Sequence, residues 1–144
     1  YMQQYAAMRA AGIEEPNPRQ QILDDIRTLV EAKRKEGFRP IVMLDANGDP
    51  HHSRDGDKAF KDFIQNANLV DHYHDKFPEQ IRTYLYGSKR LDYILIDPAL
   101  VKAVVRIGYL GAHEGTISDH VQAYVDICLQ TYTLVNFVLS RLTR

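Results

Sequence analysis

The sequence lacks the features that mark a secreted or a membrane-spanning protein. Its 144 residues include a single cysteine, Cys128, which excludes a disulfide within the chain and is compatible with a reducing compartment. No uninterrupted apolar run reaches the length of a membrane span, and the first residues have no signal-peptide architecture. We therefore expect an intracellular protein, in the nucleus or the cytoplasm, with no membrane partner.

The chain also has little net charge. Its formal charge of −1 gives no basic field of the kind that indicates nucleic-acid binding. Contacts to a single phosphate remain open, because they need only a local site. A length of 144 residues with 44% hydrophobic and 26% charged residues is typical of one soluble globular domain. The chain begins with Tyr1 rather than methionine, so we expect a piece of a longer protein.

Apolar residues at helical spacing predict two amphipathic helices. The first begins after Asn17, an N-cap residue, and ends before Gly37. The second begins at Asp57. A shorter helix within residues 1–16 and another in the tail, 130–144, complete the helical predictions.

Short apolar or alternating runs predict the strands, which together with the helices indicate the α/β class. In the central run, 90–96, both faces are apolar apart from Asp92, whose carboxylate needs a histidine or a metal beside it. In a strand over 69–75, His72 and His74 would share a face, a weak metal-ligand pattern that an exposed polar edge explains better. The other expected strands span residues 38–44, 82–86, 101–109 and 121–127.

Two polar groups stand at strand ends. Asp45 and Asn47 follow the apolar run 38–44, where an extended backbone sends both side chains to one face and an Asx turn is the simpler reading. Asp119 and His120 precede the strand 121–127. There a carboxylate can bind a cation while the imidazole handles a proton.

Three motifs occur in a fixed order: Leu-Asp-Ala-Asn at 44–47, Arg-Leu-Asp-Tyr-Ile at 90–94 and Ser-Asp-His at 118–120. Their order and spacing resemble the C-terminal half of the endonuclease/exonuclease/phosphatase superfamily, which includes deoxyribonuclease I. Thr83 and Tyr84 precede the middle motif as they often do in that family. The long helix before the first motif looks most like reverse-transcriptase-associated endonuclease domains.

The resemblance implies the C-terminal half of a four-layer α/β sandwich, in which two mixed β-sheets lie face to face with helices outside. Residues 1–144 would then be a partial domain whose N-terminal half is missing. That half is one expected partner of the chain. Nucleic acid, most simply DNA, would be the partner of the complete protein.

The resemblance also implies roles for the motif residues. Asp45 would orient or deprotonate the attacking water, and Asn47 would hold that water or the phosphate. Asp119 would bind a divalent cation, magnesium with manganese as the alternative. His120, held in the right tautomer by Asp92, would stabilise the pentavalent phosphorane or assist proton transfer.

Thr83 is assigned to substrate binding on the same grounds, together with Asn47. The reaction implied is the hydrolysis of a phosphodiester by water, as in an endonuclease. A phosphatase of inositol or lipid phosphates within the same fold is one alternative. A degenerate, non-catalytic remnant retained as an interaction module is the other.

The chain departs from the family pattern at two places. Leu44 stands where the family has glycine, and Ala46 stands where a bulky aromatic is usual, so that Ala46 leaves space. The segment before Asp45 contains nothing that resembles the family's metal-binding glutamate. We therefore expect the isolated chain to be a weak or inactive hydrolase.

Overall fold

The computed structural model describes residues 2–51, 57–79, 81–111 and 118–132. No helix in these ranges is long and apolar enough to cross a membrane. The helices, strands and one 3₁₀ helix are, in chain order, α1 (Met2–Ala10), α2 (Pro18–Lys35), β1 (Ile41–Asp45), α3 (Lys58–Asn66), α4 (His72–Lys76), β2 (Asp92–Ile96), η1 (Pro98–Ala103), β3 (Val104–Tyr109) and β4 (Ala123–Ile127).

The predicted helices form where their capping residues place them. The Asn17 side chain accepts a hydrogen bond from the Gln20 N–H at 3.0 Å and begins α2. Gly37 follows the helix with a φ of 91°, a left-handed conformation that glycine adopts without a steric cost. At α3, the Asp57 side chain accepts from the Phe60 N–H at 3.1 Å. These two helix predictions are confirmed, as is the short helix α1.

The strand predicted over residues 69–75 is wrong. Only Val70 pairs, in an isolated bridge to Ile96, and the chain then turns into α4. The Asp71 side chain causes the turn by accepting from the His74 N–H at 3.3 Å, as an N-cap does. Because His72 and His74 lie on a helix, they do not share a face as the metal-ligand pattern required.

The strand predicted over residues 82–86 is reduced to one bridge between Tyr84 and His120. The helix predicted for the tail lies largely outside the described residues, which end at 132. The other four strand predictions are confirmed with shorter bounds, as β1 to β4.

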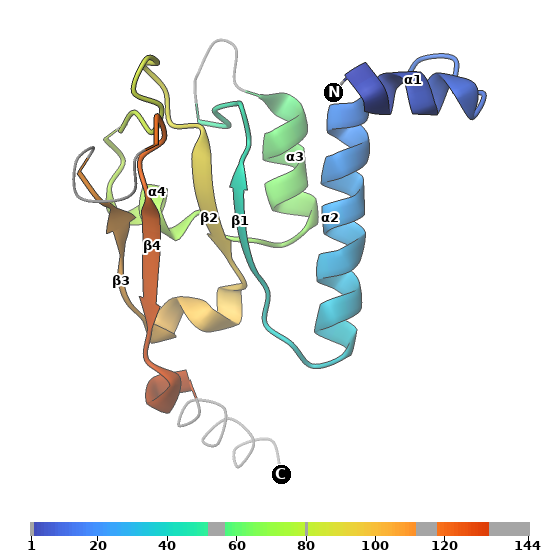
Figure 1. Ribbon diagram of the computed structural model, residues 1–144. Coiled ribbons are helices and arrows are strands. Elements are labelled where there is room, and N and C mark those ends of the chain that lie inside the picture. The colour runs from blue at the N-terminus through green and yellow to red at the C-terminus, as the bar shows by residue number, and fades with distance from the viewer. Residues whose placement is uncertain (1, 52–56, 80, 112–117, 133–144) are drawn as a thin grey trace.

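The four strands form two antiparallel pairs (Figure 1). β1 pairs with β2 so that Ile41 lies opposite Ile96 and Asp45 lies opposite Asp92. β3 pairs with β4, with a register irregularity between Val104 and Arg106. Figure 1 shows α2 and α3 on one side of the first pair and β3 and β4 on the other.

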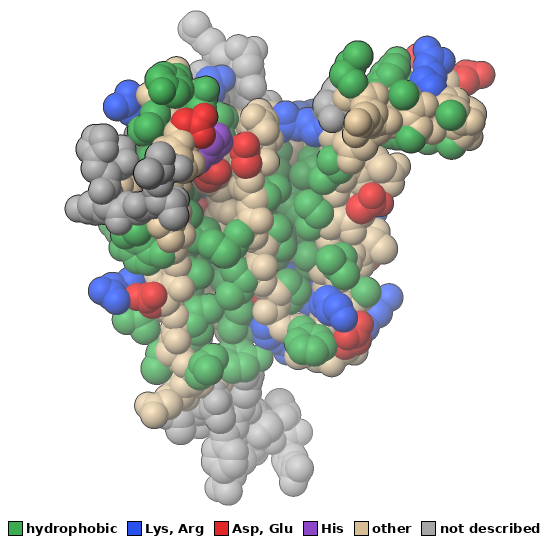
Figure 2. Space-filling model, viewed as in Figure 1, with side chains coloured by type: hydrophobic (Ala, Val, Ile, Leu, Met, Phe, Trp, Pro, Cys, Tyr) green, Lys and Arg blue, Asp and Glu red, His purple; other side chains and the backbone are tan. Residues whose placement is uncertain are grey.

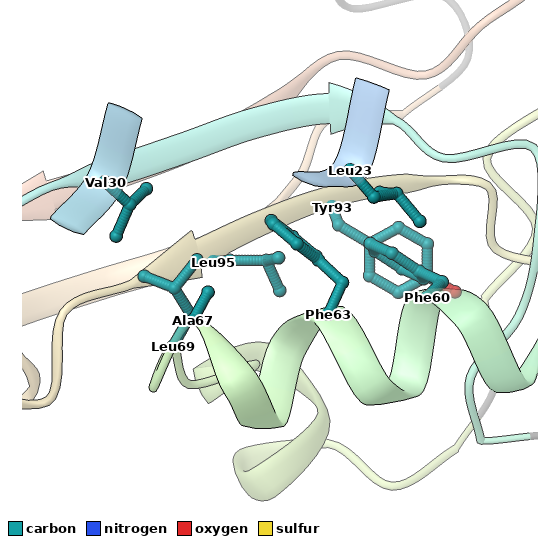
Figure 3. Packing of buried hydrophobic residues seen from close by; sticks show 8 residues of the cluster. All are labelled: Leu23, Val30, Phe60, Phe63, Ala67, Leu69, Tyr93 and Leu95. Atoms are coloured by element: carbon teal, nitrogen blue, oxygen red, sulfur yellow. The ribbon is translucent and has the colours of Figure 1, made fainter. Parts of the chain in front are cut away.

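β2 is buried on both faces, as its sequence predicts. Tyr93 and Leu95 pack against α2 and α3 in a cluster with Leu23, Phe60 and Phe63 (Figure 3). The Phe60 and Tyr93 rings meet edge to face, with their centroids 4.9 Å apart.

The opposite face of β2 carries Ile94 and Ile96. They pack against Leu100, Ile107 and the inner side chains of β3 and β4. One strand therefore ties a helical layer to the second sheet. The α/β class is confirmed, whereas the complete four-layer sandwich stays a prediction.

The second sheet covers β2 but not β1. Met43 and Ile41 lie on the same face as Ile94 and Ile96, yet they are 58% and 38% exposed. Figure 2 shows this face, with hydrophobic side chains in its middle and a histidine among acidic side chains toward its upper end. The sheet thus has one face that α2 and α3 cover, on which Val42 and Leu44 of β1 are half-buried, and one face that is open along β1.

Truncating one side chain on each face of the sheet tests whether the two faces differ in burial. Leu95→Ala removes a fully buried side chain, so we expect a loss of about 2–5 kcal/mol in the free energy of unfolding. Met43→Ala acts on an exposed side chain, and its effect should stay within about 0.5 kcal/mol. Chemical denaturation measures both. A loss at Met43 as large as that at Leu95 would show that the β1 face is covered in solution.

Candidate active site

The register of the first sheet brings two carboxylates together. Asp45 is the last residue of β1 and Asp92 the first of β2, and the two are direct cross-strand partners. The ladder continues one residue further, because the Ala46 N–H donates to the Leu91 carbonyl at 2.7 Å. Like charges directly opposite each other on a sheet are destabilising. The site therefore needs a positive group to offset them.

His120 supplies one such group. Its Nδ1 lies 2.9 Å from Asp92 Oδ2, which confirms the predicted contact between the two residues. One ligand atom each from Asp45, Asp92 and His120 can be chosen so that all three lie within 4.8 Å of one another. Three separate motifs of the sequence thus meet at one end of the first sheet.

His120 reaches this position through a short backbone ladder. The Val121 N–H donates to the Thr83 carbonyl at 2.7 Å, and the Leu85 N–H donates to the Asp119 carbonyl at 2.8 Å. The Tyr84 ring packs on the imidazole, with centroids 5.2 Å apart. The segment 83–85 is thus what holds the Ser-Asp-His motif against β2.

The hydrogen bond to Asp92 raises the pKa of His120 above its ordinary value. Burial is the next largest effect and opposes the rise, while the charges of Asp92, Asp45 and Asp119 add to it. Protonated imidazole is therefore favoured beside the two carboxylates. Because Asp92 binds Nδ1, the other ring nitrogen, Nε2, is the one that can meet a reacting group.

Two side chains hold the backbone at Asp92 by hydrogen bonds. The Thr83 hydroxyl oxygen accepts from the backbone N–H groups of Leu91 and Asp92, at 2.8 and 3.1 Å. The Tyr109 hydroxyl donates to the Asp92 carbonyl at 2.6 Å, and burial raises the pKa of Tyr109, so the phenol keeps its proton. Thr83 has no exposed surface, so it holds the strand and does not face a substrate, contrary to the role assigned from the resemblance.

The chain after Asp45 forms the Asx turn that the sequence favours over an extended backbone. Asn47 has a φ of 49°, and its N–H donates to Asp45 Oδ1 at 3.0 Å, which is the Asx turn weighed as the simpler reading. Both side chains are exposed. Asp45 is therefore fixed by its own turn, while Asn47 leaves the strand direction.

Asp119, the metal ligand implied by the resemblance, lies outside the group formed by Asp45, Asp92 and His120. Its side chain is exposed, although it lies near enough for its charge to raise the pKa of His120. The structure instead places Asp45 among the residues that could hold a cation. The sequence did not predict Asp45 as a metal ligand, because the cross-strand pairing of β1 with β2 is not visible in the sequence.

The first departure from the family pattern has a visible consequence. A mostly apolar hollow of about 290 Å³ lies between α2 and the end of β1. It is lined by Arg19, Ile22 and Leu23 of α2 and by Leu44, Asp45, Ala46 and Asn47. This hollow confirms the prediction that Ala46 leaves space. It also shows that Leu44 points toward α2 and away from the carboxylates.

Arg90, the first residue of the middle motif, is buried beneath the site. Its guanidinium pairs with Asp71 and lies 4.1 Å from the Tyr93 ring centroid. Burial by itself raises the pKa of Asp71, but the hydrogen bond with His51, at 2.9 Å, and the charge of Arg90 lower it below its ordinary value. This ionic group anchors the residues before β2 to α4.

The donor set suits a hard divalent cation. The described hydrogen bonds use Oδ1 of Asp45 and Oδ2 of Asp92, so each carboxylate has a second oxygen for a cation or a water. Asp45, Asp92 and His120 each offer one ligand atom, so the three residues could together hold a metal ion.

Comparison with models of known protein families gave no match, and comparison with curated protein sequences gave none either.

Replacing Asp45 by Asn tests whether the two carboxylates repel each other. The amide oxygen can still accept from the Asn47 N–H, so the turn is kept while one charge is removed. In chelator, we expect the free energy of unfolding to rise by about 0.5 kcal/mol. Manganese should then stabilise the parent protein but not the variant, as thermal denaturation would show.

Asp25→Asn on the exposed side of α2 is the matched control, and it should change neither property. Loss of stability in Asp45→Asn, with an unchanged manganese effect, would contradict this account of the site.

The raised pKa of His120 makes stability depend on pH. The charged imidazole stabilises the folded state, so its contribution is complete below the ordinary value of 6.5 and is lost as the pH rises through the higher folded-state pKa. We expect the stability difference between the parent and His120→Ala to shrink over that interval. Denaturation across the neutral range, in chelator, measures it. A stability difference that does not change with pH would show that the His120 imidazole is not charged in its contact with Asp92.

Proposed function

We propose that this chain carries part of a metal-dependent phosphodiesterase site of the endonuclease type. The observation that carries the proposal is the meeting of Asp45, Asp92 and His120, whose ligand atoms lie within 4.8 Å of one another. Two facing carboxylates destabilise the fold, and a function that uses both of them is one reason for the pair to be there. Strained or costly arrangements of this kind concentrate at functional sites.

The two partners of Asp92 suggest different tasks. His120, with its raised pKa, suits a group that donates a hydrogen bond or a proton through Nε2 to an oxygen that gains negative charge. Asp45 is exposed and accepts only one described hydrogen bond, so it suits the orientation or deprotonation of an attacking water. A bound magnesium or manganese ion would offset charge on the phosphoryl oxygens.

DNA is the substrate that we propose for the complete protein. A net charge of −1 gives the chain no general attraction for a polyanion, so binding would depend on the local site and on a bound cation. Asn47 is placed at the exposed rim next to Asp45, where its amide could meet a phosphate.

We also propose that a further part of the fold packs on the open β1 face. The exposed side chains of Met43 and Ile41 support this, because they continue the face on which Asp45 and Asp92 lie. A segment placed there would stand next to the carboxylates and could add a ligand. The same open face also supports the alternative of a non-catalytic interaction module.

Plasmid nicking tests the enzymatic proposal. We expect slow conversion of supercoiled to open-circular DNA at high protein concentration, dependent on magnesium or manganese and abolished by chelator. His120→Ala should lower the rate by about two orders of magnitude. His72→Ala, on α4 and outside the group of three, is the matched control and should keep the parent rate.

Absence of both cation-dependent nicking and manganese binding would favour the interaction module. Phosphate release from an inositol phosphate without any nicking of DNA would favour the phosphatase alternative. Nicking that persists in His120→Ala would place the activity elsewhere or in a contaminant.

A further inference from the structure

Helix α2 carries an arginine near each end, and both arginines make the same kind of contact. Arg19 donates from Nη2 to the Ala46 carbonyl at 2.8 Å and from Nη1 to the Asn47 carbonyl at 3.4 Å. Arg34 donates from Nη1 to the Ala67 carbonyl and from Nη2 to the Asn68 carbonyl, at 2.5 and 2.8 Å.

Each arginine also pairs with an aspartate. Arg19 pairs with Asp57, the N-cap of α3, and Arg34 pairs with Asp97 at 2.7 Å. The turns that they hold contain Asn47, with a φ of 49°, and Asn68, with a φ of 48°. These are the only two described residues other than glycine with a positive φ. A positive φ is less favourable for asparagine than for glycine, although asparagine tolerates it better than most other residues do, so contacts that hold such a turn add to its stability.

We propose that Arg19 is a positioning residue for the candidate active site, while Arg34 is its structural counterpart at the far end of the helix. The metal-binding part of this inference rests on the proposed function. Arg19 acts through the turn: it fixes the carbonyls of Ala46 and Asn47, and the Asn47 N–H in turn holds the Asp45 carboxylate at 3.0 Å.

Gly48 supports the same assignment. A Cβ atom built on Gly48 overlaps both the Asp57 carboxylate oxygen and the Arg19 guanidinium. Gly48 does not have a positive φ, so the backbone conformation itself does not demand glycine there. A methyl group at this position would instead displace the ends of the Asp57 and Arg19 side chains, and so disturb the ion pair.

The planar guanidinium is needed because it meets two carbonyls and a carboxylate at once. Arginine offers five donors in a fixed fork, whereas lysine offers one compact charge. Arg19→Lys should therefore keep the pairing with Asp57 but lose part of the hold on the turn.

The experiment compares Arg19→Gln with Arg34→Gln. We measure manganese affinity by calorimetry, at a temperature where both variants are folded, and the exchange of individual backbone amides by NMR. In Arg19→Gln the manganese affinity should fall by about tenfold or more, as when a group that holds a metal ligand is removed. Amide exchange should accelerate at Ala46 and Asn47.

In Arg34→Gln the backbone amide exchange should accelerate at Asn68 instead, and the manganese affinity should stay at the parent value. Gly48→Ala keeps both charged groups and should reproduce the effect of Arg19→Gln in milder form. If Arg19→Gln does not fold, the Gly48→Ala variant decides the question. Arg19→Lys should lie between the parent and Arg19→Gln in manganese affinity.

Equal losses of stability in the two glutamine variants, with manganese affinity unchanged in both, would overturn the proposal and leave Arg19 a structural residue. If the parent does not bind manganese, the proposed function fails on its own. The amide exchange at Ala46 and Asn47 then decides whether Arg19 holds the turn, since that readout needs neither metal nor activity.

Discussion

The antiparallel pairing of β1 with β2 is the constraint on which the other features depend. Its register places Asp45 opposite Asp92, and the same register sends Tyr93 and Leu95 to the helices and Ile94 and Ile96 to the second sheet. A slip of one residue would exchange these two sets between the faces of the sheet. The hydrophobic core and the candidate site are thus specified together.

The core holds this register against the repulsion of the two carboxylates. Burial of an apolar side chain contributes about 1.5–3 kcal/mol, and four such side chains of β2 lie in the two clusters. A cross-strand pair of like charges costs at most about 1 kcal/mol. The fold can therefore carry an unfavourable pair at the end of its central strand, and His120 reduces the cost further.

Support for the site comes from groups that lie well apart in the chain. Thr83 and Tyr109 bind the backbone of Asp92, Arg19 binds the turn after Asp45, and the Arg90–Asp71 pair lies beneath the first residues of β2. Of the three residues that meet, Asp45 is exposed and Asp92 and His120 are half-buried, and the groups that hold them are buried or half-buried. Such support places the three side chains, because a side chain is placed only as well as the backbone beneath it.

Local patterns in the sequence determined the α/β class, the caps of α2 and α3 and the two-faced burial of β2, because each depends on short-range rules. The contact of Asp92 with His120 joins two motifs that are 28 residues apart, and only the resemblance of these motifs predicted it. The tertiary structure decided the rest. Thr83 became a buried brace, and Asp45 rather than Asp119 joined the group of three. These outcomes depend on which strands pair and in what register, and pairing between segments nearly fifty residues apart leaves no local signal.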